Sequence, residues 1–167
     1  MNINNVFSQI SFGVVSLQSL SLRVDRLEVY DLIPQSVPKL LNLKNLRLSF
    51  VGAGDDCLLY LAFIMNACPQ LENFCIKPSW TSPTISRKKA RCATKPHKHL
   101  KLVEIVEYKG RKCDYEVATY IIQIVAVALK KIVIAIERIN PKKREAARSS
   151  AERIKLIKPH GVELVII

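Results

Sequence analysis

The sequence of 167 residues is poor in the features that mark several large classes of protein. Its 5 glycines never cluster as they do in the phosphate-binding loops GxGxxG and GxxxxGK[ST] or in the nucleophile elbow GxSxG. Its 5 cysteines are odd in number and form no CxxC pair, which is not typical of a secreted disulfide scaffold. These absences predict a protein that is not an enzyme, carries no cofactor and works in a reducing compartment.

The sequence also lacks a hydrophobic run long enough to cross a membrane. The longest run, residues 117–129, contains Gln123 and ends at Lys130. As a helix it would extend about 20 Å, whereas the hydrocarbon core of a bilayer is about 30 Å thick. The first thirty residues have neither the basic start nor the small-residue cleavage site of a signal peptide. We therefore expect no membrane partner and a cytoplasmic or nuclear location.

Acidic residues are few, and the excess of basic residues is confined to the second half. Lys and Arg number 26 against 14 Asp and Glu, for a net charge of +12. Residues 85–167 hold the whole excess, which is concentrated in two clusters, residues 87–98 and 142–153. Such asymmetry favours an acidic partner, either a nucleic acid or a protein. The simpler alternatives are solvated surfaces and, for the first cluster, a nuclear-import signal.

A repeated spacing organises the chain. Apolar residues recur six times as L-x-x-L-x-L, with other apolar side chains in place of some leucines, at intervals of 26 to 33 residues. Since the last two positions are two residues apart, a β-strand would point both side chains to the same face. The six copies are Leu17/Leu20/Leu22, Leu43/Leu46/Leu48, Leu71/Phe74/Ile76, Leu100/Val103/Ile105, Leu129/Ile132/Ile134 and Val162/Val165/Ile167.

The segments between copies have helical features in three places. Residues 55–68 begin with two aspartates that can cap a helix, and Pro69 follows them. Asp114 can cap a second helix, and Asn140 followed by Pro141 can cap a third. In each segment apolar residues recur at i, i+3 and i+4 or at i and i+4.

Alternating strands and helices at this period predict an α/β fold, a right-handed solenoid with parallel β-strands on the concave face and irregular helices on the convex face. We expect a single domain, residues 1–167, with N-terminal repeats in residues 1–77 and C-terminal repeats in residues 100–167. Residues 78–99 contain three prolines and the first basic cluster, so we expect a loop there in place of a helix.

Several stretches carry a more specific pattern: residues 66–74 (NACPQLENF), 97–105 (HKHLKLVEI), 120–132 (YIIQIVAVALKKI) and 159–165 (PHGVELV). Together they resemble the leucine-rich repeats of plant F-box proteins, including those that end in an FBD region. The resemblance covers about residues 17–167 and implies a leucine-rich-repeat solenoid in which residues 100–167 are FBD-like repeats.

In that family an N-terminal F-box docks on the adaptor of a cullin–RING (SCF) ubiquitin ligase, and the repeats hold the protein to be ubiquitylated. The resemblance therefore implies a non-enzymatic protein-interaction module for substrate recognition. No stretch of this sequence matches an F-box, so the ligase adaptor is not among the expected partners. The alternatives are non-specific binding of nucleic acid by the basic clusters and a truncated remnant without function.

In each strand the residue between the last two apolar positions would point away from the core. Such a row suits a broad protein surface better than a small-molecule pocket. We expect Arg47 and Glu104 of this row to contact the partner. The row comprises Ser21, Arg47, Cys75, Glu104 and Val133.

The expected loop supplies further candidates for partner binding. Trp80, at its start, is either an aromatic anchor for the partner or a cover over the edge of the solenoid. The basic candidates in the loop are Arg87, Lys88, Lys89 and Arg91.

Metal and nucleophile chemistry have little support. His97, His99, Cys92 and Cys113 could be combined into a zinc site, but structural zinc sites favour tight pairs such as CxxC. Cys92 lies near His97, yet no carboxylate is placed to orient such a pair for nucleophilic catalysis. We therefore expect no metal and no catalytic residue.

Overall fold

The computed structural model describes residues 16–27, 39–52, 57–80, 95–125, 127–138 and 140–167. In chain order the elements are β1 (Ser19–Leu27), β2 (Asn45–Gly52), α2 (Cys57–Ala67), β3 (Asn73–Trp80), β4 (Leu102–Tyr108), α4 (Lys112–Tyr120) with the π-helical turn η3 (Ile121–Val125), β5 (Lys131–Ile136), α5 (Pro141–Glu152) with the 3₁₀ turn η4 (Arg153–Leu156), and β6 (Glu163–Ile166).

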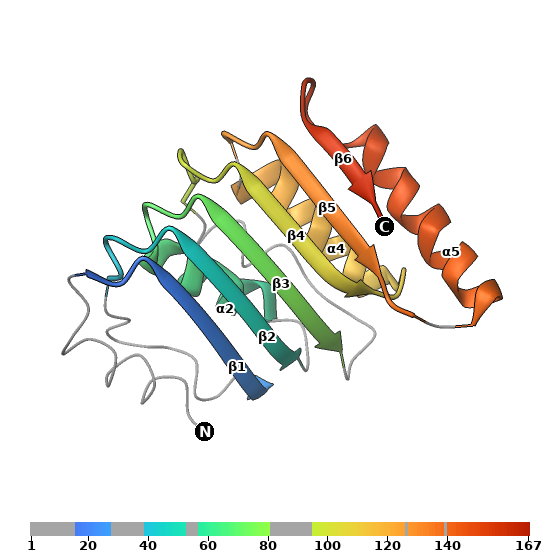
Figure 1. Cartoon of the computed structure of the whole chain (residues 1–167), viewed down its shortest axis with the longest axis horizontal. Helices are drawn as coiled ribbons and strands as arrows, with labels where there is room; N and C mark the ends of the chain where they lie inside the picture. Colours follow the sequence, from blue (N-terminus) through green and yellow to red (C-terminus); the bar gives the residue numbers. More distant parts are fainter. Residues whose placement is uncertain (1–15, 28–38, 53–56, 81–94, 126, 139) are drawn as a thin grey trace.

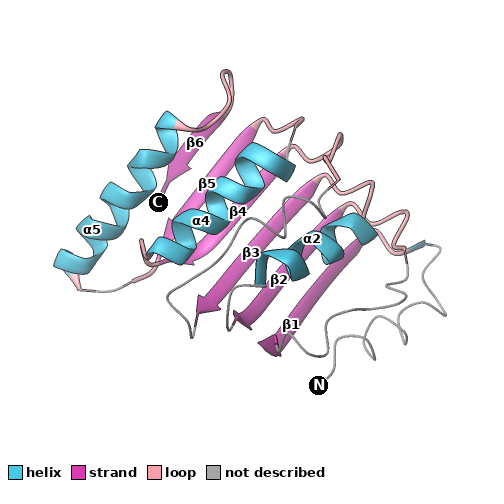
Figure 2. Cartoon of the chain, turned by 180° about the vertical axis from the view of Figure 1, so that it is seen from behind, coloured by secondary structure: helices cyan, strands magenta, loops and turns pink. Residues whose placement is uncertain are grey.

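The six described strands form one parallel sheet in sequential order, β1 to β6 (Figure 1). Helices α2, α4 and α5 all lie on the same face of this sheet (Figure 2). We call the opposite side, which none of these helices covers, the open face. The predicted α/β arrangement with parallel strands is confirmed. In the described part of the chain no helix is long and apolar enough to cross a membrane.

The strand register places the repeated apolar residues opposite one another. The second position of each repeat forms one row and the third forms another, and both rows face the helices. The rows are buried from β2 to β5, whereas Leu20, Leu164 and Ile166 at the two ends are only partly buried. The first row is Leu20, Leu46, Phe74, Val103, Ile132 and Leu164, and the second is Leu22, Leu48, Ile76, Ile105, Ile134 and Ile166.

The sixth copy departs from the predicted spacing. Leu164 and Ile166 pair with Ile132 and Ile134, whereas the sequence pattern assigned these places to Val165 and Ile167. Val162 is buried as expected, but the turn at Gly161, which has a φ of +80°, brings the chain into the strand one residue earlier. A shift of one residue exchanges the two faces of a strand, so Val165 lies on the open face.

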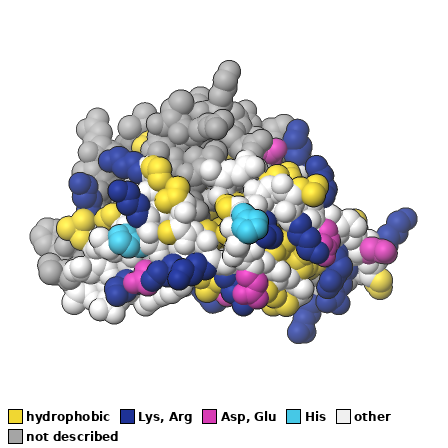
Figure 3. All heavy atoms as spheres, turned by 90° about the horizontal axis from the view of Figure 1, so that it is seen from above, with side chains coloured by type: hydrophobic (Ala, Val, Ile, Leu, Met, Phe, Trp, Pro, Cys, Tyr) yellow, Lys and Arg dark blue, Asp and Glu magenta, His cyan; other side chains and the backbone are white. Residues whose placement is uncertain are grey.

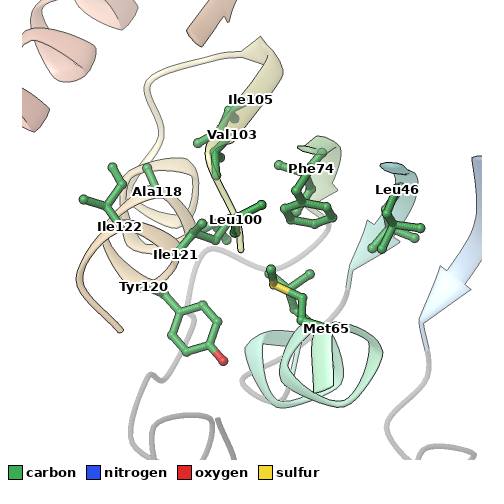
Figure 4. Packing of buried hydrophobic residues seen from close by; sticks show 14 of the residues in the cluster. Leu46, Met65, Phe74, Leu100, Val103, Ile105, Ala118, Tyr120, Ile121 and Ile122 are labelled. Carbon is green, nitrogen blue, oxygen red and sulfur yellow. The ribbon is translucent and has the colours of Figure 1, made fainter. Parts of the chain in front are cut away.

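The helices pack on the sheet through the residues that the periodicity predicted. In α2 the buried residues include Leu58, Leu61, Ala62 and Met65. Figure 4 shows Met65 of α2 below Leu46 and Phe74 of the sheet, and Leu100 next to Ile121. In α5 a narrow stripe of Ala147 and Ala151 is buried, and Ile154 continues it into η4.

The observed start of α5 agrees with the prediction from the sequence, whereas the observed start of α4 differs from it. Asn140 caps α5, since its side chain accepts a hydrogen bond of 2.9 Å from the Lys143 N–H, and Pro141 occupies the first turn. Asp114 is the third residue of α4 and not its N-cap residue, which is Arg111, but its side chain still accepts from the Arg111 backbone N–H at the helix start. The aspartates expected to cap α2 lie outside the described residues.

His97 fixes the segment before β4 beneath the end of α2. Its side chain is 4% exposed and hydrogen-bonds to the backbone of Met65, while the amide N–H of Lys95 donates to Asn66 Oδ1 over 3.0 Å. Among the described residues the Nδ1 of His97 has no partner. Burial lowers the pKa of His97, because the interior disfavours the charged imidazolium.

Acidification below the ordinary pKa of histidine should therefore destabilise the fold through His97. The unfolded chain binds the proton more readily than the folded one, so stability is lost as the pH falls from about 7 through about 6.5. Substitution His97→Gln keeps a donor for the Met65 backbone and removes the titration. The free energy of unfolding of wild type and variant, measured by urea at about pH 7.5 and about pH 5.5, should converge at the lower pH. A constant difference between the two proteins would contradict this assignment.

Candidate functional site

The open face carries three rows of outward-pointing side chains: rows 1 and 2 have one residue from each of the six described strands, and row 3 has one from each of β1 to β5. Row 1 is Ser19, Asn45, Asn73, Leu102, Lys131 and Glu163; row 2 is Ser21, Arg47, Cys75, Glu104, Val133 and Val165; row 3 is Arg23, Ser49, Lys77, Val106 and Ala135. Row 2 contains the five residues that the sequence predicted. The parallel register therefore brings together positions that lie 26 to 32 residues apart in the chain.

Row 2 places Cys75 between the two predicted contact residues, Arg47 and Glu104. Arg47 is exposed, Glu104 is partly exposed, and Cys75 itself is 7% exposed between them. Burial raises the pKa of the Cys75 thiol, the nearby Arg47 lowers it, and Glu104 raises it through its charge and a hydrogen bond. Cys75 is consequently a neutral thiol, and the charges of this row available to a partner are those of Arg47 and Glu104.

Side chains on the open face fall into two halves of different chemistry. Over β1 to β3 the three rows are formed by hydroxyl, amide and basic side chains, with Cys75 as the exception; we call this the polar half. From β4 onward most positions are aliphatic, and each of them is partly exposed. We call the second set the apolar half, and it consists of Leu102, Val106, Val133, Ala135 and Val165.

A ladder of amides fixes the upstream edge of the polar half. Asn73 Nδ2 donates to Asn45 Oδ1 over 2.6 Å, and Asn45 Nδ2 donates to Ser19 Oγ over 3.0 Å. The ladder borders a shallow hollow of about 440 Å³, which rows 1 and 2 line from β1 to β4. Because the amides hydrogen-bond one another across the strands, their orientation is set before any partner arrives.

A second hollow, of about 290 Å³, lies at the downstream end of β1 to β3. Its charged lining comprises Arg23, Lys77 and Glu107. Glu107 has a φ of +56° and lies in a bulge of β4 between Val106 and Tyr108. By strict alternation Glu107 would face the helices, whereas the bulge places the carboxylate 2.5 Å from Lys77 Nζ and leaves Tyr108 fully buried. The bulge thus keeps a charge out of the core and adds it to the open face.

Ion pairs border the sheet where the strands begin. Glu72 accepts from Lys101 over 3.0 Å and lies 3.3 Å from Lys44, while Lys131 pairs with Glu163 at 3.3 Å. The hydrogen bond from Lys101, followed by that from Lys44, lowers the pKa of Glu72. All these groups are exposed or partly exposed, so the ion pairs contribute little stability.

Trp80 is buried and does not open a loop. It is the last residue of β3, is 8% exposed, and packs edge-on against Phe50 with ring centroids 5.3 Å apart. Its indole N–H donates to Asp114 Oδ1 over 2.9 Å. The strand continues through Pro78, which pairs with Phe50, although proline was interpreted as the start of a loop. Of the two alternatives for Trp80, the burial excludes an exposed anchor for a partner and fits a cover over the edge of the repeats.

Asp114 joins β3, the β4–α4 connection and α4. Its second oxygen, Oδ2, accepts from the backbone N–H of Arg111 over 3.0 Å and of Lys109 over 3.2 Å. Arg111 in turn donates through Nη1 to the Trp80 carbonyl oxygen over 3.5 Å. Burial raises the pKa of Asp114, while these hydrogen bonds and the Arg111 charge act in the opposite direction. The hydrogen bonds of Asp114, Trp80 and Arg111 therefore join these elements, and we assign this group a structural role.

Other predicted residues lie where the structure gives no description. Arg87, Lys88, Lys89 and Arg91 fall in residues 81–94, outside the described ranges, and so does Cys92 of the weighed zinc site. Within the described ranges no three His, Cys, Asp or Glu side chains are grouped closely enough to hold a metal ion.

The sequence interpretation missed the apolar half of the open face. The signal was present in the strands themselves: SLSLRV, NLRLSF and NFCIKP alternate apolar with other residues, whereas KIVIAI and ELVII are almost continuously apolar. A continuous apolar run indicates a strand with aliphatic side chains on both faces. Because none of the described helices lies over the second face, this run leaves aliphatic side chains accessible.

Comparison with protein families places the chain among known repeats. A family model described as At1g61320/AtMIF1, LRR domain, matches residues 2–161, a range that extends from before β1 to beyond α5. None of the curated proteins and none of the solved structures compared with the chain matches it.

Proposed function

The chain belongs to the family of At1g61320/AtMIF1 leucine-rich-repeat (LRR) domains, and we propose that the open face of its sheet binds a partner protein. One observation carries the proposal: aliphatic side chains of β4 to β6 stay partly exposed beside a polar half with charged and amide groups. Protein interfaces combine an apolar centre with a polar rim in this way. The two shallow hollows suit side chains of a broad partner surface.

Arg47 and Glu104 are the contact residues that we propose in the polar half. They flank the neutral Cys75 and differ in charge, so they would set the orientation of a partner of complementary charge pattern. The basic residues Arg87, Lys88, Lys89 and Arg91 remain proposed contacts of the same partner. Val133 and Val165, in the same row, would supply apolar contact area next to Glu104.

We further propose a specific role for this binding: the module presents its partner protein to a ubiquitin ligase, as the resemblance to F-box proteins implies. It is tested by affinity capture of the tagged chain from plant cells at about 150 and about 500 mM salt, with and without nuclease. Co-purification of the ligase adaptor and a cullin would support delivery to the ligase. Partners that resist high salt, without those subunits, would support a free-standing binding module. Loss of all partners with nuclease would overturn both and favour nucleic-acid binding.

Reversal of both row 2 charges, Arg47→Glu with Glu104→Lys, should abolish capture of the salt-resistant partner. The net charge stays constant, so only the charge pattern of the open face changes. A matched control reverses the Glu152 and Lys155 ion pair on the helical side, Glu152→Lys with Lys155→Glu. Circular dichroism checks the fold of each variant. Equal capture by both variants, or loss of the fold together with capture, would contradict the proposal.

The apolar half is tested separately by Val133→Thr with Val165→Thr. Threonine keeps the branched shape and the strand propensity of valine, while each hydroxyl costs about 1 kcal/mol of apolar contact on binding. The double variant should therefore bind about tenfold or more weakly, measured by titrating the purified partner. Unchanged affinity would restrict the interface to the polar half.

A further inference from the structure

The aliphatic side chains of the open face lie in the middle of the sheet. Leu102 and Val106 of β4 and Val133 and Ala135 of β5 are each partly exposed. Strand β4 pairs with β3 and β5, and β5 pairs with β4 and β6, so these four side chains are away from both edges of the sheet. A contiguous apolar surface of this kind marks a place where another molecule binds.

The apolar half offers no polar side chain to the backbone of a bound segment. Its members are aliphatic, and the adjacent row 1 charges, Lys131 and Glu163, pair with each other at 3.3 Å. An extended segment lying on it would shield its own N–H and C=O groups from water without giving them new partners, which costs free energy. A helix bonds these groups within itself. The apolar half therefore favours a helix as its occupant.

The spacing of row 2 also matches a helix that crosses the strands. Since neighbouring strands are about 4.8 Å apart, Arg47 on β2 and Glu104 on β4 are separated by about 10 Å along the row. On one side of a helix, residues i and i+7 are about 10.5 Å apart. An extended segment places side chains on one side about every 6.7 Å, so with one residue over Arg47 none would lie directly over Glu104.

Arg47 and Glu104 are the row 2 charges that such a helix would meet. Neither forms an ion pair with a described residue, whereas acidic and basic side chains at the border of the sheet pair with one another. Figure 3, seen from the ends at which the strands begin, shows acidic side chains in magenta next to basic ones in dark blue. The other charged side chains in and beside the three rows are Arg23, the Lys77–Glu107 pair and the Lys131–Glu163 pair. Row 2 therefore presents a positive charge on β2 and a negative charge on β4.

The hollow beside these charges has room for one large side chain. Its volume is about 440 Å³, and on the open face its lining combines the short Ser19, Ser21 and Cys75 with the longer Arg47 and Glu104. With residue i of a helix over Arg47 and residue i+7 over Glu104, residue i+4 points at the middle of the hollow, near Cys75. The hollow thus lies where a helix of this register needs space.

We propose that the open face binds an amphipathic helix of the partner protein, which lies along row 2 across the strands. The helix carries an acidic residue over Arg47, a large apolar residue in the hollow and a basic residue over Glu104, at positions i, i+4 and i+7. Its apolar residues from i+10 onward cover Val133 and the rest of the apolar half. This inference rests on the proposed function and specifies which element of the partner is bound.

The test titrates the full chain with capped 18-residue peptides by fluorescence anisotropy. The helix-spaced peptide has glutamate at position 2, lysine at position 9 and leucine at positions 6, 12, 13 and 16, with alanine and glutamine elsewhere. The strand-spaced control has the same composition and places these six residues, in the same order, at every second position. The reverse sequence of each is included, because row 2 fixes the order of the charges and not the chain direction. A helix-spaced peptide should bind at least about tenfold more tightly than the strand-spaced ones.

An exchange of charges tests the register. Arg47→Glu with Glu104→Lys should weaken binding of the helix-spaced peptide at least about tenfold and should favour the peptide in which glutamate and lysine are exchanged. The matched control, Glu152→Lys with Lys155→Glu on the helical side, should bind as the wild type does. The proposal is overturned if no helix-spaced peptide binds, if a strand-spaced peptide or single-stranded DNA binds more tightly, or if the exchanged peptide binds the wild type equally well. A dimer of the free chain that the row 2 variant dissociates would also overturn it.

These outcomes are distinct from a failure of the proposed function. Partner capture that depends on Arg47 and Glu104, together with failure of the helix-spaced peptides, would reject the helix and keep the open face as the binding surface. Capture that does not depend on these residues would reject the proposed function, and this inference with it.

Discussion

Substitution Gly110→Ala is expected to lower the free energy of unfolding by about 3 kcal/mol, which corresponds to a fall in Tm of about 6–12 °C for a chain of this size. Gly110 lies between β4 and α4 and has a φ of +74°, a conformation that side chains with a Cβ rarely adopt. A Cβ built on Gly110 would lie 2.6 Å from the Ala147 Cα of α5, a contact with backbone that no side-chain rotation relieves. The added methyl group would push α5 off the sheet.

Gly161→Ala is the matched control. Its φ of +80° imposes the same conformational strain, but a Cβ there would meet no atom within 4 Å. This substitution should lower the free energy of unfolding by about 1 kcal/mol, because it adds backbone strain but no steric clash. Both variants are measured by thermal and urea denaturation. Equal losses would show that the approach of α5 to Gly110 is not what requires glycine.

The second large effect is expected from Asp114→Ala, which should cost about 3 kcal/mol or more. The substitution leaves three N–H donors without their acceptor: the Trp80 indole and the Lys109 and Arg111 amides. These donors come from β3 and from the connection to α4, so their loss uncouples two repeats. The variant Trp80→Phe removes one donor and keeps the two amide bonds, and it should cost clearly less. A larger loss in Trp80→Phe would place the stabilisation in ring packing and not in the carboxylate.

The loss in Asp114→Ala should also depend on pH in a defined direction. Burial raises the pKa of Asp114 above its unfolded value, so the folded chain holds the proton more tightly than the unfolded chain. The contribution of Asp114 is then greatest below the unfolded pKa and decreases as the pH rises through the folded pKa. The difference between wild type and Asp114→Ala should be larger at about pH 4 than at about pH 7. The opposite trend would mean that the hydrogen bonds outweigh burial.

Much of the fold follows from local patterns in the sequence. Spacing of two residues between Leu46 and Leu48, or between Ile132 and Ile134, is a property of single strands, and the helix-facing rows follow once the strands are parallel. Helix α5 follows from Asn140 and Pro141 together with the buried stripe of Ala147 and Ala151. In such segments the backbone preference and the apolar periodicity indicate the same structure.

The mistaken predictions have two causes, pairing with residues distant in the sequence and local backbone geometry that the residue pattern did not resolve. Pro78 was interpreted as a breaker, but pairing with β2 carries β3 through to Trp80. Asp114 was interpreted as a helix cap, but the Trp80 indole and two amides hold it inside the first turn of α4. In the sixth repeat, the turn at Gly161 shifted the register by one residue. The pairing of Pro78 and the bond from Trp80 depend on distant residues, whereas the amide bonds of Asp114 and the turn at Gly161 are local.

The candidate site, like the fold, follows in part from local sequence patterns and in part only from the tertiary structure. The sequence by itself determined the period, the parallel strands and the row from Ser21 through Arg47 and Glu104 to Val133, because side chains alternate in any strand. Only the tertiary structure decided which face the described helices leave open, and hence that Val133 and Val165 lie partly exposed next to the polar half. It also decided that Trp80 is buried. Burial depends on what packs on a residue, and those neighbours come from other repeats.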